Sequence, residues 1–271
     1  MTAHPLDPLC ATEIEAAAAI VRAQSGLDET GWFETITLHE GDRRKPVTGR
    51  RAYVCCYERS SNRTLRGVVD LEAGNLESWD HVPGAQARIP PDEFADGDRI
   101  AKADPDFLEA LEKRGITDPS KVLVETWAAG NFGIPDEQGR RIAYCHCWHI
   151  NDAGDNRYGR PIANLHPVVD LERQELIRID DFGVVPLPPD TAAIRPADGL
   201  RRDIKPLEIT QPDGPSFEVD GYHVRWQRWN IRVGYDLRES LVLHDIGYED
   251  GGRVRPIIRR ASMAEMVVPY G

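Results

Sequence analysis

Residues 12–26 read Thr-Glu-Ile-Glu-Ala-Ala-Ala-Ala-Ile-Val-Arg-Ala-Gln-Ser-Gly, and they indicate how the fold begins. Thr12 followed three residues later by Glu15 is a capping-box pattern, which predicts a helix with Thr12 as its N-cap. The alanine-rich run favours a helix, and Gly26 is expected to end it. Four apolar or β-branched segments of strand length come next, at residues 31–40, 52–59, 64–71 and 75–82. A helix followed by a four-strand meander predicts a small α+β domain.

The same order of elements then starts again. Residues 90–94, Pro-Pro-Asp-Glu-Phe, open a helical stretch, and Asp104-Pro105 marks a second helix start, because Asp is a good N-cap and Pro suits the first helical position. Strands are predicted at residues 122–128, 141–149, 162–170 and 175–180. We therefore expect two tandem α+β units. No repeat of individual residues is apparent between them, so the expected likeness is one of architecture only.

The last third of the chain is predicted to be nearly all β. A proline-rich stretch at residues 185–196 predicts a linker. Residues 229–235 alternate apolar with polar or small side chains, which is the period-2 pattern of a half-buried strand. Residues 241–248 and 253–260 flank a Glu-Asp-Gly-Gly turn and predict a hairpin. So short a β region would leave sheet edges open, so this pattern predicts only part of a domain.

Composition and charge limit the classes of function. The 271 residues contain 33 Lys and Arg against 45 Asp and Glu, a net charge of −12, and a chain this acidic repels nucleic-acid phosphates. No apolar run reaches the ~18–20 residues of a membrane helix, and no signal-peptide pattern opens the chain, so we expect no membrane partner and a cytoplasmic location. Five cysteines, an odd number at low density, do not indicate a disulfide framework.

The densest group of potential metal ligands is Cys145-His146-Cys147-Trp148-His149. On a strand, Cys145, Cys147 and His149 share one face, but same-face neighbours lie roughly 6.6 Å apart and project in parallel. Zinc ligands must instead converge to about 2.0–2.3 Å from the metal. We therefore interpret these as ordinary strand residues, with a metal or redox site as the alternative. No Gly-x-Ser-x-Gly, P-loop, Gly-x-Gly-x-x-Gly or His-Glu-x-x-His motif occurs, so spacing alone predicts no catalytic site.

The C-terminal region resembles a known family. Residues 206–217, Pro-Leu-Glu-Ile-Thr-Gln-Pro-Asp-Gly-Pro-Ser-Phe, are very similar to the segment that opens the catalytic domain of copper amine oxidases. The similarity continues through residues 229–239 and 243–246 and, over residues 255–271, to the final residue. Residues 4–9, His-Pro-Leu-Asp-Pro-Leu, resemble the family's usual start. The chain thus resembles the N-terminal portion of a bacterial copper-containing, topaquinone-dependent primary-amine oxidase.

The resemblance implies a fold and its domain boundaries. The fold class is α+β, with two tandem small domains, each a helix packed on a four-strand antiparallel sheet, followed by the first strands of a large, truncated β-sandwich domain. The first α+β domain is expected at residues 1–90 and the second, with the proline-rich linker, at residues 91–200. The start of the catalytic β-sandwich domain is expected at residues 201–271.

The resemblance also implies an activity and its cofactors. Family members convert a primary amine, O2 and water to an aldehyde, ammonia and hydrogen peroxide, using copper and topaquinone. The quinone is made from a tyrosine in an Asn-Tyr context, an aspartate acts as general base, and three histidines, two of them in His-x-His, hold copper. This sequence has neither Asn-Tyr nor His-x-His, and the family's base aspartate follows the segment at residues 267–271. We therefore expect no catalytic residue, no bound copper and no topaquinone in this chain, which alone should be inactive. In the full-length family the substrate is a primary amine and the protein is a homodimer.

Three residues are implied to line the family's substrate channel: Phe94, Trp127 and Tyr158. Phe94 and Trp127 are equally well explained as core aromatics. Tyr158 stands in a polar stretch, where an aromatic ring with a hydroxyl group favours a surface or gate role. Two other functions stay open from the sequence: a free-standing, non-catalytic α+β module that binds a partner, and a small metalloprotein that uses Cys145, Cys147 and His149.

Overall fold

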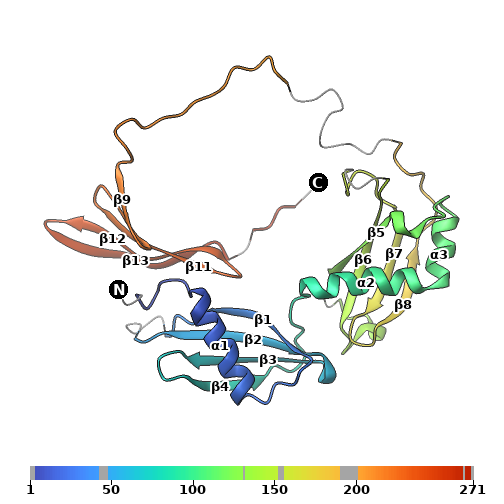
Figure 1. Ribbon diagram of the computed structural model, residues 1–271, viewed down its shortest axis with the longest axis horizontal. Coiled ribbons are helices and arrows are strands. Elements are labelled where there is room, and N and C mark those ends of the chain that lie inside the picture. The colour runs from blue at the N-terminus through green and yellow to red at the C-terminus, as the bar shows by residue number, and fades with distance from the viewer. Residues whose placement is uncertain are drawn as a thin grey trace. The chain divides into compact units, whose positions relative to one another are not determined.

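The computed structural model describes residues 4–42, 48–130, 132–151, 156–189, 201–264 and 266–269. The chain divides into two compact units. Unit one is formed by Met1–Glu58, Arg63–Ala85 and Leu207–Gly271, and unit two by Arg59–Asn62 and Gln86–Pro206. The fold is α+β, as predicted, with three antiparallel sheets of four, four and five strands in the described part of the chain (Figure 1).

Unit one opens with helix α1 (Ala11–Gln24), which lies across one face of a four-stranded antiparallel sheet (Figure 1). The strands, in sheet order, are β1 (Gly31–Leu38), β2 (Arg51–Glu58), β3 (Arg63–Asp70) and β4 (Asn75–His81). The helix and the sheet bury a shared apolar core made of Ala17, Val21, Leu27, Ala52, Val54, Cys56, Leu65 and Val69. Burial of this apolar surface is what stabilises the helix, because an isolated helix of this length is marginal in water.

The start of α1 differs from the prediction. The N-cap is Cys10 rather than Thr12, and the acidic residue that closes the capping box is Glu13, whose Oε2 accepts a hydrogen bond from the Cys10 backbone N–H at 2.9 Å. Glu13 is also held by the guanidinium of Arg50, at 2.7 Å from Nε. This long-range contact selects Glu13 over Glu15, and it is invisible in the local capping pattern.

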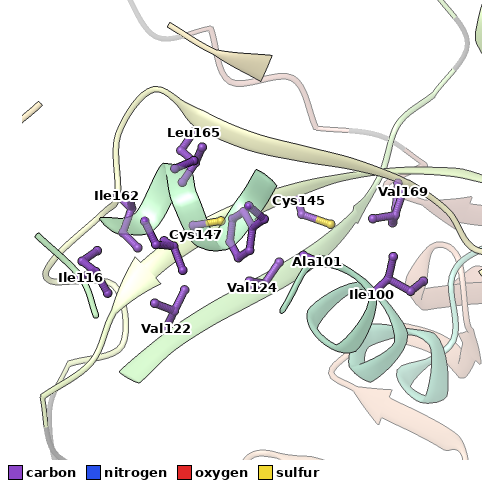
Figure 2. Close-up of a cluster of buried hydrophobic side chains, with 14 of the residues drawn as sticks. Ile100, Ala101, Ile116, Val122, Val124, Cys145, Cys147, Ile162, Leu165 and Val169 are labelled. Carbon is purple, nitrogen blue, oxygen red and sulfur yellow. The ribbon is translucent and has the colours of Figure 1, made fainter. Parts of the chain in front are cut away.

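Unit two repeats this plan with two helices, α2 (Pro91–Ala103) and α3 (Pro105–Glu112). Its antiparallel sheet contains, in order, β5 (Val122–Ala128), β6 (Ile142–His149), β7 (Leu165–Asp170) and β8 (Glu175–Asp181). The predicted cap of α3 is confirmed, because the Asp104 side chain accepts hydrogen bonds from the backbone N–H groups of Asp106 and Phe107. The core between helices and sheet is drawn in Figure 2, where Cys145 and Cys147 lie among apolar side chains.

The two units share individual residues as well as architecture, so the expectation of a purely architectural likeness is wrong. Residues 68–76 read Val-Val-Asp-Leu-Glu-Ala-Gly-Asn-Leu, and residues 168–176 read Val-Val-Asp-Leu-Glu-Arg-Gln-Glu-Leu. Both segments carry a β-bulge between the two valines. The aspartates Asp70 and Asp170 each accept hydrogen bonds from the backbone N–H groups two and three residues later. The same turn therefore closes the β3–β4 and β7–β8 hairpins.

A second shared feature is a buried arginine that precedes the second strand of each sheet. Arg50 and Arg141 stand directly before β2 and β6, and each binds the glutamate at the third position of its unit's first helix, Glu13 or Glu93. Each arginine also donates to backbone carbonyls of the segment that leads into that helix. We call these two arrangements the Arg50 clamp and the Arg141 clamp. Each ties the entering chain, the helix start and the sheet together.

The third sheet belongs to unit one. Its antiparallel strands, in sheet order, are β13 (Arg253–Ser262), β12 (Ser240–Asp250), β11 (Trp229–Asp236), β10 (His223–Trp226) and β9 (Phe217–Asp220). The predicted hairpin is confirmed, and Gly251 and Gly252 adopt the positive φ angles, 59° and 77°, that its tight turn requires. Ion pairs join this sheet to the N-terminal part of the same unit, at 2.6 Å between Arg232 and Asp7 and 2.8 Å between Arg260 and Glu40.

The third sheet leaves large apolar side chains in solvent. They include Phe217, Val219, Tyr222, Trp226, Leu241, Val254, Ile257 and Ile258. Exposed apolar side chains in this number are typical of a sheet that packs against a further layer. No helix in the described part of the chain is long and apolar enough to cross a bilayer. The predicted proline-rich linker lies partly outside the described residues.

Candidate functional site

Cys145 and Cys147, the candidate metal ligands on β6, point into the core of unit two (Figure 2). Both side chains are buried, and burial raises the pKa of the Cys145 thiol to about 12 and that of Cys147 further still. A thiol must lose its proton to bind a metal, so these environments disfavour ligation. The third candidate, His149, has its Nδ1 3.0 Å from the guanidinium of Arg160. Among the described residues, no group of three His, Cys, Asp or Glu side chains could hold a metal ion.

The opposite face of the same sheet carries a cluster of rings. Trp127 projects from β5, His146 and Trp148 from β6 and His166 from β7, and Tyr158 comes from the segment between β6 and β7. The ring centroids lie 6.0 Å apart for Trp127 and His146, and 5.9 Å apart for His146 and Trp148. They lie 5.3 Å apart for His146 and His166 and for Trp148 and Tyr158. Together with Glu125 of β5, we call these five rings the aromatic cluster.

Glu125 links two rings of the aromatic cluster. The indole N–H of Trp127 donates to Glu125 Oε2 at 2.9 Å, and the hydroxyl of Tyr158 donates to Oε1, also at 2.9 Å. This bond to a carboxylate raises the pKa of the Tyr158 hydroxyl, so that tyrosine stays protonated. Strand pairing places Glu125 directly opposite His146. Burial and the neighbouring His166 lower the pKa of His146, so its imidazole is neutral near pH 7.

The structure brings two of the three predicted channel residues together. Trp127 and Tyr158 are 55% and 57% exposed, and both contact Glu125. Phe94 lies on α2, and its backbone carbonyl accepts a hydrogen bond from Thr126, the neighbour of Trp127. Its side chain is 48% exposed. The alternative interpretation of Phe94 and Trp127 as core aromatics is therefore wrong.

Sequence reasoning missed Glu125, His146 and His166 as members of one cluster. Glu125 and Trp127 are two residues apart, so on a strand they share a face, and that signal was available. Their proximity to His146 depends on the strand register, which pairs Glu125 of β5 with His146 of β6. Register between strands far apart in the chain cannot be read from the spacing within either strand.

Comparison with protein families matches two segments of the chain. The copper amine oxidase N3 domain matches residues 92–193, and the copper amine oxidase enzyme domain matches residues 218–271. The chain belongs to the copper amine oxidase family. The N3 match covers the whole of the sheet that carries the aromatic cluster, and the enzyme-domain match covers most of the third sheet.

Individual relatives agree with this assignment. A primary amine oxidase of Arthrobacter sp. (strain P1) is 40% identical over 277 residues, an alignment that covers 99% of this chain and 42% of the relative. A histamine oxidase of Arthrobacter globiformis is 36% identical, with 99% of this chain and 41% of the relative covered. The copper-containing benzylamine oxidase from Hansenula polymorpha has the same fold, with a TM-score of 0.72 at 22% identity over 96% of this chain and 44% of that one. The chain therefore spans less than half the length of these relatives.

Proposed function

We propose that this chain is the N-terminal part of a copper- and topaquinone-dependent oxidase that converts primary amines, O2 and water to aldehydes, ammonia and hydrogen peroxide. The observation that carries the proposal is the enzyme-domain match at residues 218–271, combined with coverage of 42% of the similar primary amine oxidase. Domain boundaries at residues 90 and 200, a homodimer and a cytoplasmic location belong to the same proposal.

The described residues do not fit a copper site. They contain no suitable group of three ligands, and the buried thiols of unit two have raised pKa values. We therefore derive no chemical step through copper or quinone from these residues. In the proposed whole protein, both groups and the base aspartate lie outside residues 1–271, and this chain alone has no oxidase activity.

The proposed contribution of this chain is to line the path of the amine with Phe94, Trp127 and Tyr158. The support is that all three side chains are about half exposed, and that Trp127 and Tyr158 hold one carboxylate between them. Exposed aromatic rings offer apolar and cation–π contact to an organic amine without binding it tightly.

The test is to sequence the DNA beyond the Gly271 codon, and to express both the 271-residue chain and the chain with any continuation. Each purified protein is then assayed for peroxide with benzylamine and stained for quinone. We expect the 271-residue chain to be negative in both assays and the continued chain to be positive. A downstream sequence that encodes no Asn-Tyr, no His-x-His and no base aspartate in any frame would remove the proposal's support.

A second candidate function is a free-standing binding module, and the buried apolar core of unit two favours it. The exposed apolar side chains of the third sheet count against it. A module of this kind should be a soluble chain that unfolds cooperatively and resists proteolysis beyond Leu207. Rapid loss of residues 207–271 to protease, or aggregation of the isolated chain, would exclude the module.

A further inference from the structure

The carboxylate of Glu125 is set among rings without a cationic partner. Within the described residues it forms no ion pair with lysine or arginine, and its two contacts are to neutral donors, the Trp127 indole and the Tyr158 hydroxyl. Neutral donors fix the position of a carboxylate but leave its charge in place. The aromatic cluster therefore carries one fixed negative charge.

Glu125 also has unused capacity to accept hydrogen bonds. An ionised carboxylate has about four lone-pair sites, and the Trp127 and Tyr158 contacts occupy one on each oxygen. A ligand with N–H donors can use the remaining sites. The neighbouring rings add the negative face of their π-systems, which attracts cations within about 6 Å of the ring centroid.

The fold itself does not require this cluster. Unit one has the same sheet, and strand pairing there gives Thr35 opposite Cys55, and Thr37 opposite Tyr53. In unit two the corresponding pairs are Glu125 with His146, and Trp127 with Tyr144. A carboxylate and an indole thus stand where unit one has two threonines, which are half-buried there, with the Thr37 hydroxyl 3.4 Å from Asp236 of the third sheet. Stability of the α+β plan does not explain that exchange, because threonine is well suited to such strand positions.

We propose that Glu125, with the rings of Trp127 and Tyr158, binds the ammonium group of a primary alkylammonium ion. The ammonium N–H groups donate to the free lone pairs of Glu125 while the organic part of the ligand lies against the exposed rings. The neutral imidazole of His146 offers no competing positive charge. The net charge of −12 favours the approach of cations to the chain as a whole.

This inference deepens the proposed function and rests on it for the view that the bound ammonium ion is a substrate. Glu125 would then concentrate the cationic form of the amine at the aromatic cluster. It is a binding residue and takes no part in oxidation.

The experiment is a titration of the ¹⁵N-labelled 271-residue chain, followed by NMR through the indole N–H signal of Trp127. Three probes of similar shape are used: benzylammonium, benzyltrimethylammonium and the neutral benzyl alcohol. We expect benzylammonium to shift the signal saturably, benzyltrimethylammonium to bind more weakly because it has no N–H donor, and benzyl alcohol to leave the signal unchanged. Equal binding of benzyl alcohol would overturn the proposal, because it would show a purely apolar surface.

Two matched variants complete the test. Glu125→Gln keeps the side-chain shape and should weaken benzylammonium binding about tenfold, since a hydrogen bond to a charged group is lost. Glu112→Gln removes a carboxylate at the end of α3, outside the cluster, and should leave binding unchanged. Unchanged binding by Glu125→Gln, with its NMR spectrum still that of a folded chain, would contradict the proposal.

The outcomes also separate this inference from the proposed function. Benzylammonium binding at Glu125, in a protein whose continued chain has no oxidase activity, would support the binding site and contradict the proposed oxidase function. Oxidase activity in the continued chain, with a benzylamine KM unchanged by Glu125→Gln, would support the oxidase and remove the site.

Discussion

Both α+β units pair an arginine with a glutamate at equivalent positions, but the glutamate is buried to different degrees. In the Arg50 clamp the side chain of Glu13 keeps 21% of its surface exposed, whereas in the Arg141 clamp Glu93 is fully buried. The ion pair of unit two therefore lies in the interior, whereas that of unit one lies next to the surface. A buried charge depends on its partner far more than an exposed one does. The same contact should thus matter much more to unit two than to unit one.

The largest expected effect is the loss of the Arg141 clamp. Arg141→Ala leaves the buried carboxylate of Glu93 with the partly exposed Arg59, 3.5 Å away, as its remaining cationic partner, which should cost up to about 3–5 kcal/mol of unfolding free energy in unit two. Arg50→Ala should cost unit one about 1–3 kcal/mol, because water reaches Glu13. Hydrogen exchange of core amides in each unit measures both effects. Equal losses in the two variants would show that burial does not set the difference.

The next largest effect is expected from substitutions at the closest contact between each helix and its sheet. Counting from the clamped glutamates, Gly97 of α2 takes the place of Ala17 of α1. A Cβ at Gly97 would overlap the side chain of Thr126 and lie 3.3 Å from the sulfur of Cys145. Gly97→Ala should therefore destabilise unit two by about 1–3 kcal/mol through overpacking.

Ala17→Gly in α1 is the control, with an expected loss of only about 1 kcal/mol from helix propensity. Urea unfolding of the two variants measures both losses. Stabilisation by Gly97→Ala would mean that α2 has room to move away from its sheet.

A smaller effect is expected at the shared turn. Gly74 in unit one and Gln174 in unit two both have positive φ, 67° and 59°. Gly74→Ala has open space around it but forces an L side chain into the left-handed region, so it should cost about 1 kcal/mol. Gly252→Ala, at φ 77° in the β12–β13 turn, should cost a similar amount. Thermal unfolding tests both, and a neutral Gly74→Ala would show that this turn can relax.

The smallest effect concerns acid stability. The guanidinium of Arg114 lowers the pKa of Asp181, at the end of β8, to about 2. Because the folded-state pKa lies below the ordinary value of 3.8, the contact stabilises unit two above that value and is lost as pH falls towards about 2. Asp181→Asn should therefore flatten the decline of unfolding free energy in this range. Asp213→Asn, an exposed residue of unit one, is the control and should leave the decline unchanged.

Local patterns in the sequence predicted most of the strands and the α+β class, because period-2 alternation and turn residues act over short distances. These local patterns gave the wrong element boundary where a residue far away in the chain determines it. Arg50 selects Glu13 for the helix start, and it is 37 residues away in the chain. The residue-level repeat was missed because it is concentrated in β2 and β6 and in the turns after Asp70 and Asp170, while the helices that precede β2 and β6 differ in sequence.

The candidate site was predictable only in part. The resemblance to copper amine oxidases supplied Phe94, Trp127 and Tyr158, and the structure adds that Glu125 joins the last two. Cys145 and Cys147 were interpreted as ordinary strand residues, and their burial agrees with that. The repeat gives a reason, because Cys56 of β2 takes the same core position as Cys147 of β6 and is likewise buried.

The Arg141 clamp also determines where the chain can be cut. Its guanidinium donates hydrogen bonds to oxygen atoms of Gln86, Ala87 and Arg88, all of which precede α2. A truncation that begins at the first residue of the helix would discard these acceptors and leave the buried guanidinium in need of new ones. A truncation that begins at Gln86 would keep them, so the short peptide before the helix travels with unit two in any dissection of the protein.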